Sequence, residues 1–155
     1  MAVELPKAAI ERIFRQGIGE RRLSQEAKDV IYEFVPKMAR YAADSSKAIL
    51  DASGKKTLME EHLKALTQVL MVDGAEEYDG ELFGRATVRR ILKEAGVERA
   101  SADAVDLYNK LICRITEELG ERAAEYADED DRKTVQREDV EKAITCIMPR
   151  ADEFL

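Results

Sequence analysis

Residues 10–24 of the chain read IERIFRQGIGERRLS, and residues 88–101 repeat this pattern as VRRILKEAGVERAS. At the start of the match, corresponding residues are 78 positions apart, whereas Ser24 and Ser101 are 77 positions apart. One extra residue within 17–23 of the first copy explains the change of spacing. A pattern that is repeated once at so long a period is typical of a two-fold pair rather than of a solenoid.

The repeat extends over nearly the whole chain. We therefore predict a first copy at residues 1–72 and a second copy at residues 82–149, joined by an acidic linker at 73–81 and followed by a short tail at 150–155. Each copy has roughly seventy residues, a size at which a core of its own is marginal. One core shared by both copies is the better interpretation.

The composition indicates an all-helical protein. The chain has 155 residues, no Trp and only three Pro, and it is rich in residues that favour helices. No apolar stretch approaches the eighteen or so residues needed to cross a bilayer, and no signal peptide is visible, so we expect a cytoplasmic protein with no membrane partner. The net charge of −7 argues against a nucleic-acid binder, although the position of each cation on the surface matters more than the total.

Apolar spacing predicts the same three helices in each copy. In the first copy a short helix begins near Pro6 and ends at Gly17, a long helix runs from its N-cap Ser24 to about Ala52, and a third short helix follows. The second copy repeats this order with Ser101 as N-cap. A helix of some 28 residues is about 40 Å long, and its apolar stripe needs a second long helix across it. The other copy supplies that partner.

The short–long–short layout, with a basic loop after each of the first two helices, resembles the histone fold, and archaeal histones are the most similar branch. The residues that carry the resemblance are Ile10, Arg12, Ile13, Arg15, Glu20, Arg21, Ser24 and Gly54-Lys-Lys-Thr57 in the first copy, and Val88, Arg90, Ile91, Lys93, Glu98, Arg99, Ser101 and Arg132-Lys-Thr134 in the second. In that family two histone folds pair in a head-to-tail handshake and bind duplex DNA. The resemblance implies that this single chain folds as an intramolecular pseudo-dimer.

Such a handshake would place three basic patches along one edge of the molecule, one at each end and one in the middle. The predicted DNA contacts are Arg12, Arg15, Arg21, Arg22, Lys55, Lys56, Thr57, Arg90, Lys93, Arg99, Arg132, Lys133 and Thr134. Arg99 and either Arg21 or Arg22 are expected to enter the minor groove, the other cations to contact phosphates, and the threonines to donate hydrogen bonds. The alternative is that these residues are solvated charges at helix ends.

The second loop departs from the family pattern in the first copy. Archaeal histones brace this loop with a salt bridge, which Arg132 and Asp139 are predicted to form in the second copy. Lys55 and His62 hold the corresponding places in the first copy and cannot form such a bridge. We therefore expect a looser loop there.

The two ends of the pseudo-dimer are predicted to differ in polarity. The first-copy end carries the mostly apolar set Ile49, Ala52, His62 and Ala65, whereas the second-copy end includes the acidic run 128–131. An apolar end tends to self-associate, and an acidic end repels its like. We predict that two chains meet through their first-copy ends in a tetramer-like assembly and that growth stops there.

No catalytic motif is present in the sequence. It has no HExxH, no Ser/His/Asp set and no glycine-rich nucleotide fingerprint, so no enzyme, cofactor or small-molecule substrate is predicted. His62 is the only histidine, and Cys113 and Cys146 are the only cysteines. We expect both thiols in the core and no metal site, although the acidic run would suit a hard cation.

Two functions of different classes remain open. The first is a chromosome-associated histone that bends, wraps and compacts double-stranded DNA without strong sequence preference. The second is a histone-fold module that pairs proteins, as a transcription-factor subunit does. The Arg and Lys-Thr positions found in both copies favour the first, and the net charge of −7 favours the second.

Overall fold

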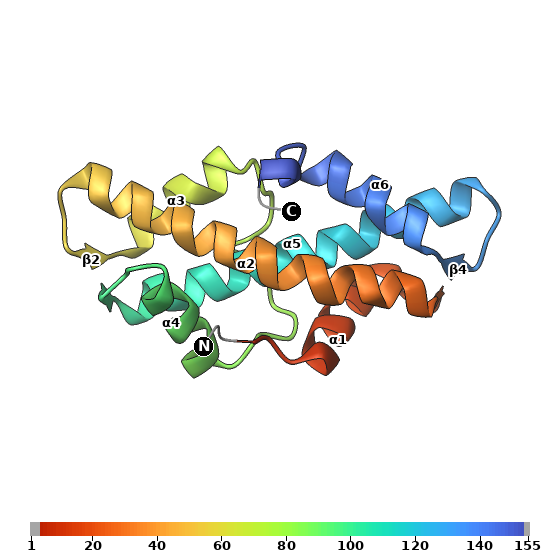
Figure 1. The fold of residues 1–155 in the computed structure, drawn as a ribbon, viewed down its shortest axis with the longest axis horizontal. Coiled ribbons are helices and arrows are strands. Elements are labelled where there is room, and N and C mark those ends of the chain that lie inside the picture. Colours follow the sequence, from red (N-terminus) through yellow and green to blue (C-terminus); the bar gives the residue numbers. More distant parts are fainter. Residues whose placement is uncertain (1–3, 154–155) are drawn as a thin grey trace.

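The computed structural model describes residues 4–153, in which each copy forms a short, a long and a short helix (Figure 1). The helices are α1 (Lys7–Ile18), α2 (Gln25–Ser53), α3 (Glu60–Val69), α4 (Arg85–Glu94), α5 (Ala102–Glu129) and α6 (Arg137–Ile147), followed by a 3-10 turn at Ala151–Glu153. The strands have two residues each and are β1 (Arg22–Leu23), β2 (Thr57–Leu58), β3 (Arg99–Ala100) and β4 (Thr134–Val135). The all-α prediction is confirmed.

Two parallel strand pairs show how the copies are joined. β1 pairs with β4, and β2 pairs with β3, so each pair takes one strand from each copy. The backbone N–H of Ser24 donates to the carbonyl oxygen of Val135 at 3.0 Å, and that of Ser101 donates to the carbonyl oxygen of Leu58 at 2.9 Å. The two copies therefore clasp each other head to tail with equivalent registers, and the handshake prediction is confirmed.

The two long helices, α2 and α5, cross at the centre of the molecule (Figure 1). Each begins at a serine whose hydroxyl accepts a hydrogen bond from a backbone N–H three residues later, at 3.1 Å for Ser24 and 3.0 Å for Ser101, as expected of an N-cap. Helices α1 and α4 lie along one long edge, α3 and α6 lie along the opposite edge, and β2 and β4 mark the two ends.

Both copies contribute to one hydrophobic core. Phe14, Phe34 and Met38 of the first copy and Tyr108 of the second are all at most 2% exposed. The Tyr108 hydroxyl donates a hydrogen bond to the carbonyl oxygen of Ala39 at 2.6 Å, which joins α5 to α2 inside the core. Burying a large apolar side chain contributes about 1.5–3 kcal/mol, so either copy alone would lose much of its stabilisation.

The extra residue of the first copy lies in the last turn of α1. Gly19 and Gly96 follow the two short helices, both have positive φ angles (65° and 99°), and they are 77 positions apart, so the insertion precedes Gly19. In this last turn α1 meets α5, and a Cβ on Gly17 or on Gly120 would collide with the backbone of the other helix. Two facing glycines therefore bring the backbones of the two copies into direct contact.

One expectation from the sequence is wrong in detail. Cys113 is buried, but Cys146 is exposed, because Val140, Ala143 and Ile144 occupy the core face of α6. Helix α3 begins at Glu60 with Met59 as its N-cap, since the backbone at residue 57 pairs with β3. Within residues 4–153 no helix has both the length and the apolar character needed to span a membrane.

Candidate nucleic-acid interface

The strand register identifies the counterpart of Arg99. Arg22 faces Thr134 in the β1–β4 pair, and Arg99 faces Thr57 in the β2–β3 pair. Both arginines are exposed, and among the described residues neither forms a salt bridge. Arg22 rather than Arg21 is thus the structural equivalent of Arg99, and the two mark opposite ends of the molecule.

Arg21, in contrast, is held by contacts within the protein. Its Nε and Nη2 donate to the two carboxylate oxygens of Asp128 at 2.9 and 2.5 Å, and its Nη1 donates to the carbonyl oxygen of Ile18 at 2.8 Å. These hydrogen bonds hold the pKa of Asp128 below its ordinary value. Arg21 ties the end of α1 to the end of α5, which leaves its guanidinium less available for DNA than the sequence predicted.

The predicted bridge between Arg132 and Asp139 is formed at the β1–β4 end. Arg132 Nη1 and Nη2 lie 2.7 and 2.8 Å from the carboxylate oxygens of Asp139, whose side chain is 1% exposed. Burial raises the pKa of Asp139, but the hydrogen bonds from Arg132 and from the backbone N–H of Gln136 outweigh burial and leave the pKa lowered. Arg132 is therefore a structural brace, and the exposed cation of this loop is Lys133.

The β2–β3 end has a brace of another kind. His62 holds the place of Asp139, and its Nδ1 accepts a hydrogen bond from the backbone N–H of Met59 at 2.9 Å, while its Nε2 lies 3.2 Å from the hydroxyl of Ser53. The expectation of a looser loop in the first copy did not take these hydrogen bonds of His62 into account. Lys56 is exposed beside it, and Lys55 forms only a 3.3 Å contact with Glu61.

Helices α1 and α4 supply the predicted cations between the two strand pairs, along the same edge (Figure 1). On α1, Arg12 is bound to Glu81 of the linker and Arg15 to Glu11. On α4, Arg90 and Lys93 are exposed, and among the described residues neither has an ion-pair partner. All three predicted patches thus lie along one edge, but their cations differ in how they are paired.

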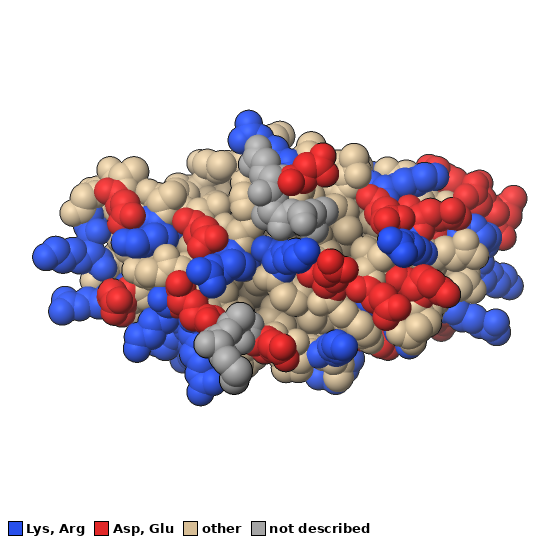
Figure 2. All heavy atoms as spheres, in the orientation of Figure 1, with Lys and Arg blue, Asp and Glu red and all other residues tan. Residues whose placement is uncertain are grey.

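Surface charge is distributed unevenly along the molecule. Figure 2 shows Lys and Arg gathered over the end that holds β2 and α4, and Asp and Glu gathered over the end that holds β4 and α6. The net charge of −7 is therefore the sum of two ends that differ in charge, and the local distribution matters more for binding than the total.

Comparisons with known proteins agree with this architecture. A family model described as histone-like transcription factor (CBF/NF-Y) and archaeal histone matches residues 3–66 and 82–144, once for each copy. The chain belongs to this family. The resemblance to archaeal histones that the sequence predicted is confirmed, and the family is not an enzymatic one.

Individual relatives cover one or both of the histone folds. The crystal structure of a histone from Methanopyrus kandleri is 81% identical, covers 97% of this chain and 99% of its own, and superposes with a TM-score of 0.95. One subunit of the archaeal histone HAN1 from Thermococcus zilligii is 37% identical over 59 residues, which are 38% of this chain and 88% of that protein. A protein of Thermus thermophilus shares the fold alone, with 17% identity over 94% of this chain and 98% of its own, and a TM-score of 0.66.

Two acids of the run 128–131, Asp128 and Asp130, form ion pairs within the histone fold. Oxygens of Asp130, Glu138 and Asp139 lie within 4.8 Å of one another, but the guanidinium of Arg132 lies among them, 2.7–3.4 Å from all three. One internal cation thus compensates part of the charge of these three carboxylates. Asp128 is likewise occupied by Arg21.

The first-copy end presents part of the predicted chain–chain interface. Ala52 is exposed, and Ile49 and Ala65 are half-buried. His62 is only 5% exposed and caps α3, so little of its side chain is available at this surface. Because His62 holds the place of the buried Asp139, its capping of α3 explains this position better than a contact between chains does.

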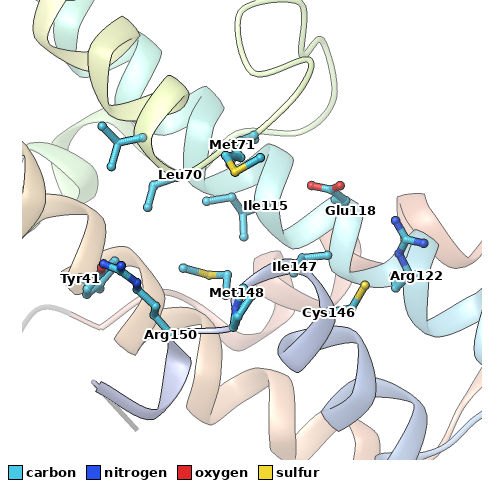
Figure 3. A pocket seen from close by; sticks show the side chains of 13 residues that line it. Tyr41, Leu70, Met71, Ile115, Glu118, Arg122, Cys146, Ile147, Met148 and Arg150 are labelled. Carbon is cyan, nitrogen blue, oxygen red and sulfur yellow. The ribbon is translucent and has the colours of Figure 1, made fainter.

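An apolar groove lies on the edge opposite to the basic patches. It has a volume of about 680 Å³ between α3, α5 and α6, and Figure 3 shows Leu70, Ile115 and Met148 converging on it. Met71, with a φ of 56° and 86% exposure, stands at its rim. The groove therefore lies apart from the candidate DNA-binding edge.

The repeat pattern did not predict one of the exposed cations on this edge. Arg89 on α4 is exposed, and among the described residues it has no ion-pair partner. The corresponding residue of the first copy is Glu11, 78 positions earlier. Because the predicted contacts were residues shared by both copies, they did not include a position at which the copies carry opposite charges.

Proposed function

We propose that this histone binds, bends and compacts double-stranded DNA with little sequence preference and that it is associated with the chromosome. The observation that carries this proposal is the placement of Arg22 and Arg99 at equivalent positions of two strand pairs, with α1 and α4 between them on one edge (Figure 1). A duplex that follows this edge would meet cations at both ends and in the middle.

Bending stiff DNA costs a few kcal/mol over a short site, so the protein must offset that cost with repeated phosphate contacts. Lys56 and Lys133 are exposed in the loops beside the two threonines. The first turns of α1 and α4 add backbone N–H groups, which attract phosphate. Because a curved duplex can make more of these spaced contacts than a straight one, they favour the curved form.

The proposed contacts carry little sequence information. Phosphate contacts position a protein on DNA without reading bases, and an arginine in the minor groove reads groove width rather than sequence. Arg22 and Arg99 are the residues proposed for that role, with Thr57 and Thr134 as hydrogen-bond donors. The complex should therefore form on random-sequence duplex.

The test is the affinity for a random-sequence duplex as a function of salt concentration. If about six phosphates are neutralised, the logarithm of the association constant falls with the logarithm of salt concentration at a slope of about −5. The variant R22Q/R99Q should weaken binding and flatten that slope. The variant K64Q/K142Q removes the same charge from α3 and α6 on the opposite edge and should bind as the wild type does.

Failure to bind at low salt would reject this function. It would favour the alternative in which the fold chiefly pairs proteins, for which the net charge of −7 is the supporting observation. Equal losses in the two double variants would mean that the duplex does not follow the α1–α4 edge.

We further propose that two chains meet through their first-copy ends, where Ile49, Ala52 and Ala65 lie, and that the acidic second-copy ends keep such pairs apart. Glu129 and Asp131 are exposed at that end and, among the described residues, have no ion-pair partner. Like charges repel, so assembly should stop at two chains. Sedimentation should show a limited assembly on DNA. Long filaments without DNA, or strict monomers with it, would contradict this assembly.

A further inference from the structure

Helices α1 and α4 are counterparts, yet their solvent-exposed faces differ in charge and in pairing. On α1, the three Arg12 contacts with the carboxylate of Glu81 measure 2.8–3.0 Å, and Arg15 lies 2.8 Å from Glu11. Glu11 also accepts a hydrogen bond from the Tyr32 hydroxyl at 2.8 Å. The arginines of α1 thus already hold carboxylates where a phosphate would bind.

The linker fixes Glu81 in this position. The backbone N–H of Glu81 donates to Gln16 Oε1 at 2.8 Å, and its carbonyl oxygen accepts from the hydroxyl of the buried Tyr78 at 2.5 Å. Gln16 Nε2 in turn donates to the Tyr78 hydroxyl at 2.9 Å. Because hydrogen bonds hold both its backbone N–H and its carbonyl oxygen, Glu81 is positioned to pair with Arg12 before any DNA binds.

The ion pairs lower the pKa of the two carboxyl groups. The hydrogen bonds from Arg12 lower the pKa of Glu81, and those from Arg15 and then Tyr32 lower the pKa of Glu11. Both groups are therefore carboxylates throughout the neutral range. A DNA phosphate that reaches α1 has to compete with a resident negative charge.

Helix α4 offers the opposite situation. Val88, Ile91 and Leu92 face the core, so Arg89, Arg90 and Lys93 share the outer face of the helix. All three are exposed, and within the described part of the chain none has an ion-pair partner. Figure 2 shows the gathering of Lys and Arg at this end of the molecule.

We propose that DNA engages the two halves unevenly, with Arg89, Arg90 and Lys93 of α4 as the principal contact between the two strand pairs. Helix α1 is a secondary contact, because Glu81 and Glu11 hold its arginines until the duplex displaces them. This inference rests on the proposed DNA binding and names the part of the surface that carries it. The two halves of the pseudo-dimer are then unequal in function.

Counterion release makes the difference measurable. Each cation that gains a phosphate changes the salt slope by about 0.9, whereas an arginine that exchanges a carboxylate for a phosphate gains less, since one anion replaces another. Two lost contacts on α4 should flatten the slope by about 1.8. The same two charges removed from α1 should change it by less than half as much.

The experiment compares variants matched in charge on a random-sequence duplex. R90Q/K93Q should lower the affinity at 0.1 M salt by more than tenfold, because two released counterions at that concentration correspond to about 60-fold. R12Q/R15Q should lower it by less than about threefold. Gln has nearly the helix propensity of Arg and Lys, and circular dichroism confirms that each variant is folded.

Removing the resident carboxylates is the complementary arm. E11Q/E81Q should bind more tightly than wild type and with a steeper salt slope. E77Q/D79N removes the same charge from exposed linker carboxylates that, within residues 4–153, have no ion-pair partner, and it should improve binding much less.

Equal losses from R90Q/K93Q and R12Q/R15Q, or equal gains from the two carboxylate variants, would overturn the uneven engagement and leave DNA binding itself in place. Absence of binding by the wild type would instead reject the proposed function. The two failures are thus distinguishable in one set of titrations.

Discussion

Arg22 and Arg99 occupy equivalent places at opposite ends of the molecule, each paired across two short strands with a threonine of the other copy. The equivalence survives an insertion, because the extra residue of the first copy is absorbed by α1 before Gly19. A single chain thereby reproduces the two-fold arrangement of a histone dimer while its two halves are free to differ in sequence.

Exchange of Arg22 should weaken DNA binding more than exchange of its neighbour Arg21. R22Q removes an exposed cation at a strand pair, whereas R21Q removes one that is already bound to Asp128. We expect R22Q to match R99Q in affinity for random-sequence duplex, and R21Q to lie closer to wild type. Fluorescence anisotropy at fixed salt measures all three, and a larger effect of R21Q would contradict the assignment.

Loss of the Asp139 carboxylate should destabilise the protein. D139A leaves Arg132 without its bidentate partner and the backbone N–H of Gln136 without its acceptor. Removing one member of a buried pair costs about 3–5 kcal/mol, and the partial exposure of Arg132 reduces the expected loss to about 2–3 kcal/mol. Urea unfolding provides the measurement. A change below about 0.5 kcal/mol would mean that the brace contributes nothing.

Alanine at either glycine of the α1–α5 contact should destabilise the fold. A Cβ on Gly17 or on Gly120 would meet backbone atoms that cannot move aside, at a cost of about 3 kcal/mol. Alanine is otherwise the better helix former by about 1 kcal/mol, so a loss has the opposite sign to helix propensity. In the control G84A the added atom finds its neighbour at 3.6 Å, and the loss should stay within about 1 kcal/mol.

Stability should fall as the pH drops through the range of carboxyl groups. The pKa of Asp139 is lower in the folded protein than its ordinary value, so the unfolded chain takes up the proton first as the pH falls below about 5. The stabilisation is complete above that range and is lost as the pH falls through the folded pKa. Urea unfolding between pH 6 and pH 3 should show this slope, and D139N should show a shallower one. Identical slopes would exclude Asp139 as a source.

The repeat and the apolar spacing predicted the helices and the shared core, and the resemblance to the histone fold predicted the handshake. Ser24 and Ser101 are local N-cap signals, and a long apolar stripe on each side requires a partner helix. The sequence could not decide whether Arg21 or Arg22 is the equivalent of Arg99. An insertion of unknown position leaves two alignments open, and only the strand pairing decides between them.

The candidate site was less predictable than the fold. Which cations are already ion-paired depends on carboxylates that are distant in sequence, such as Glu81 for Arg12 and Asp128 for Arg21. Arg89 escaped notice because its counterpart is Glu11. Pairing across such distances has no local signal in one sequence, so the charge that a surface offers to DNA has to be read from the structure.

The most direct test of the central claim, that a duplex follows one edge of the pseudo-dimer, is lysine acetylation with and without random-sequence DNA. Lys56 and Lys133 are exposed beside the two strand pairs and Lys93 is exposed on α4 between them, whereas Lys64 and Lys142 are exposed on α3 and α6. DNA should protect the first three together and leave the last two reactive. Protection of Lys64 and Lys142, or protection confined to one end, would contradict the account.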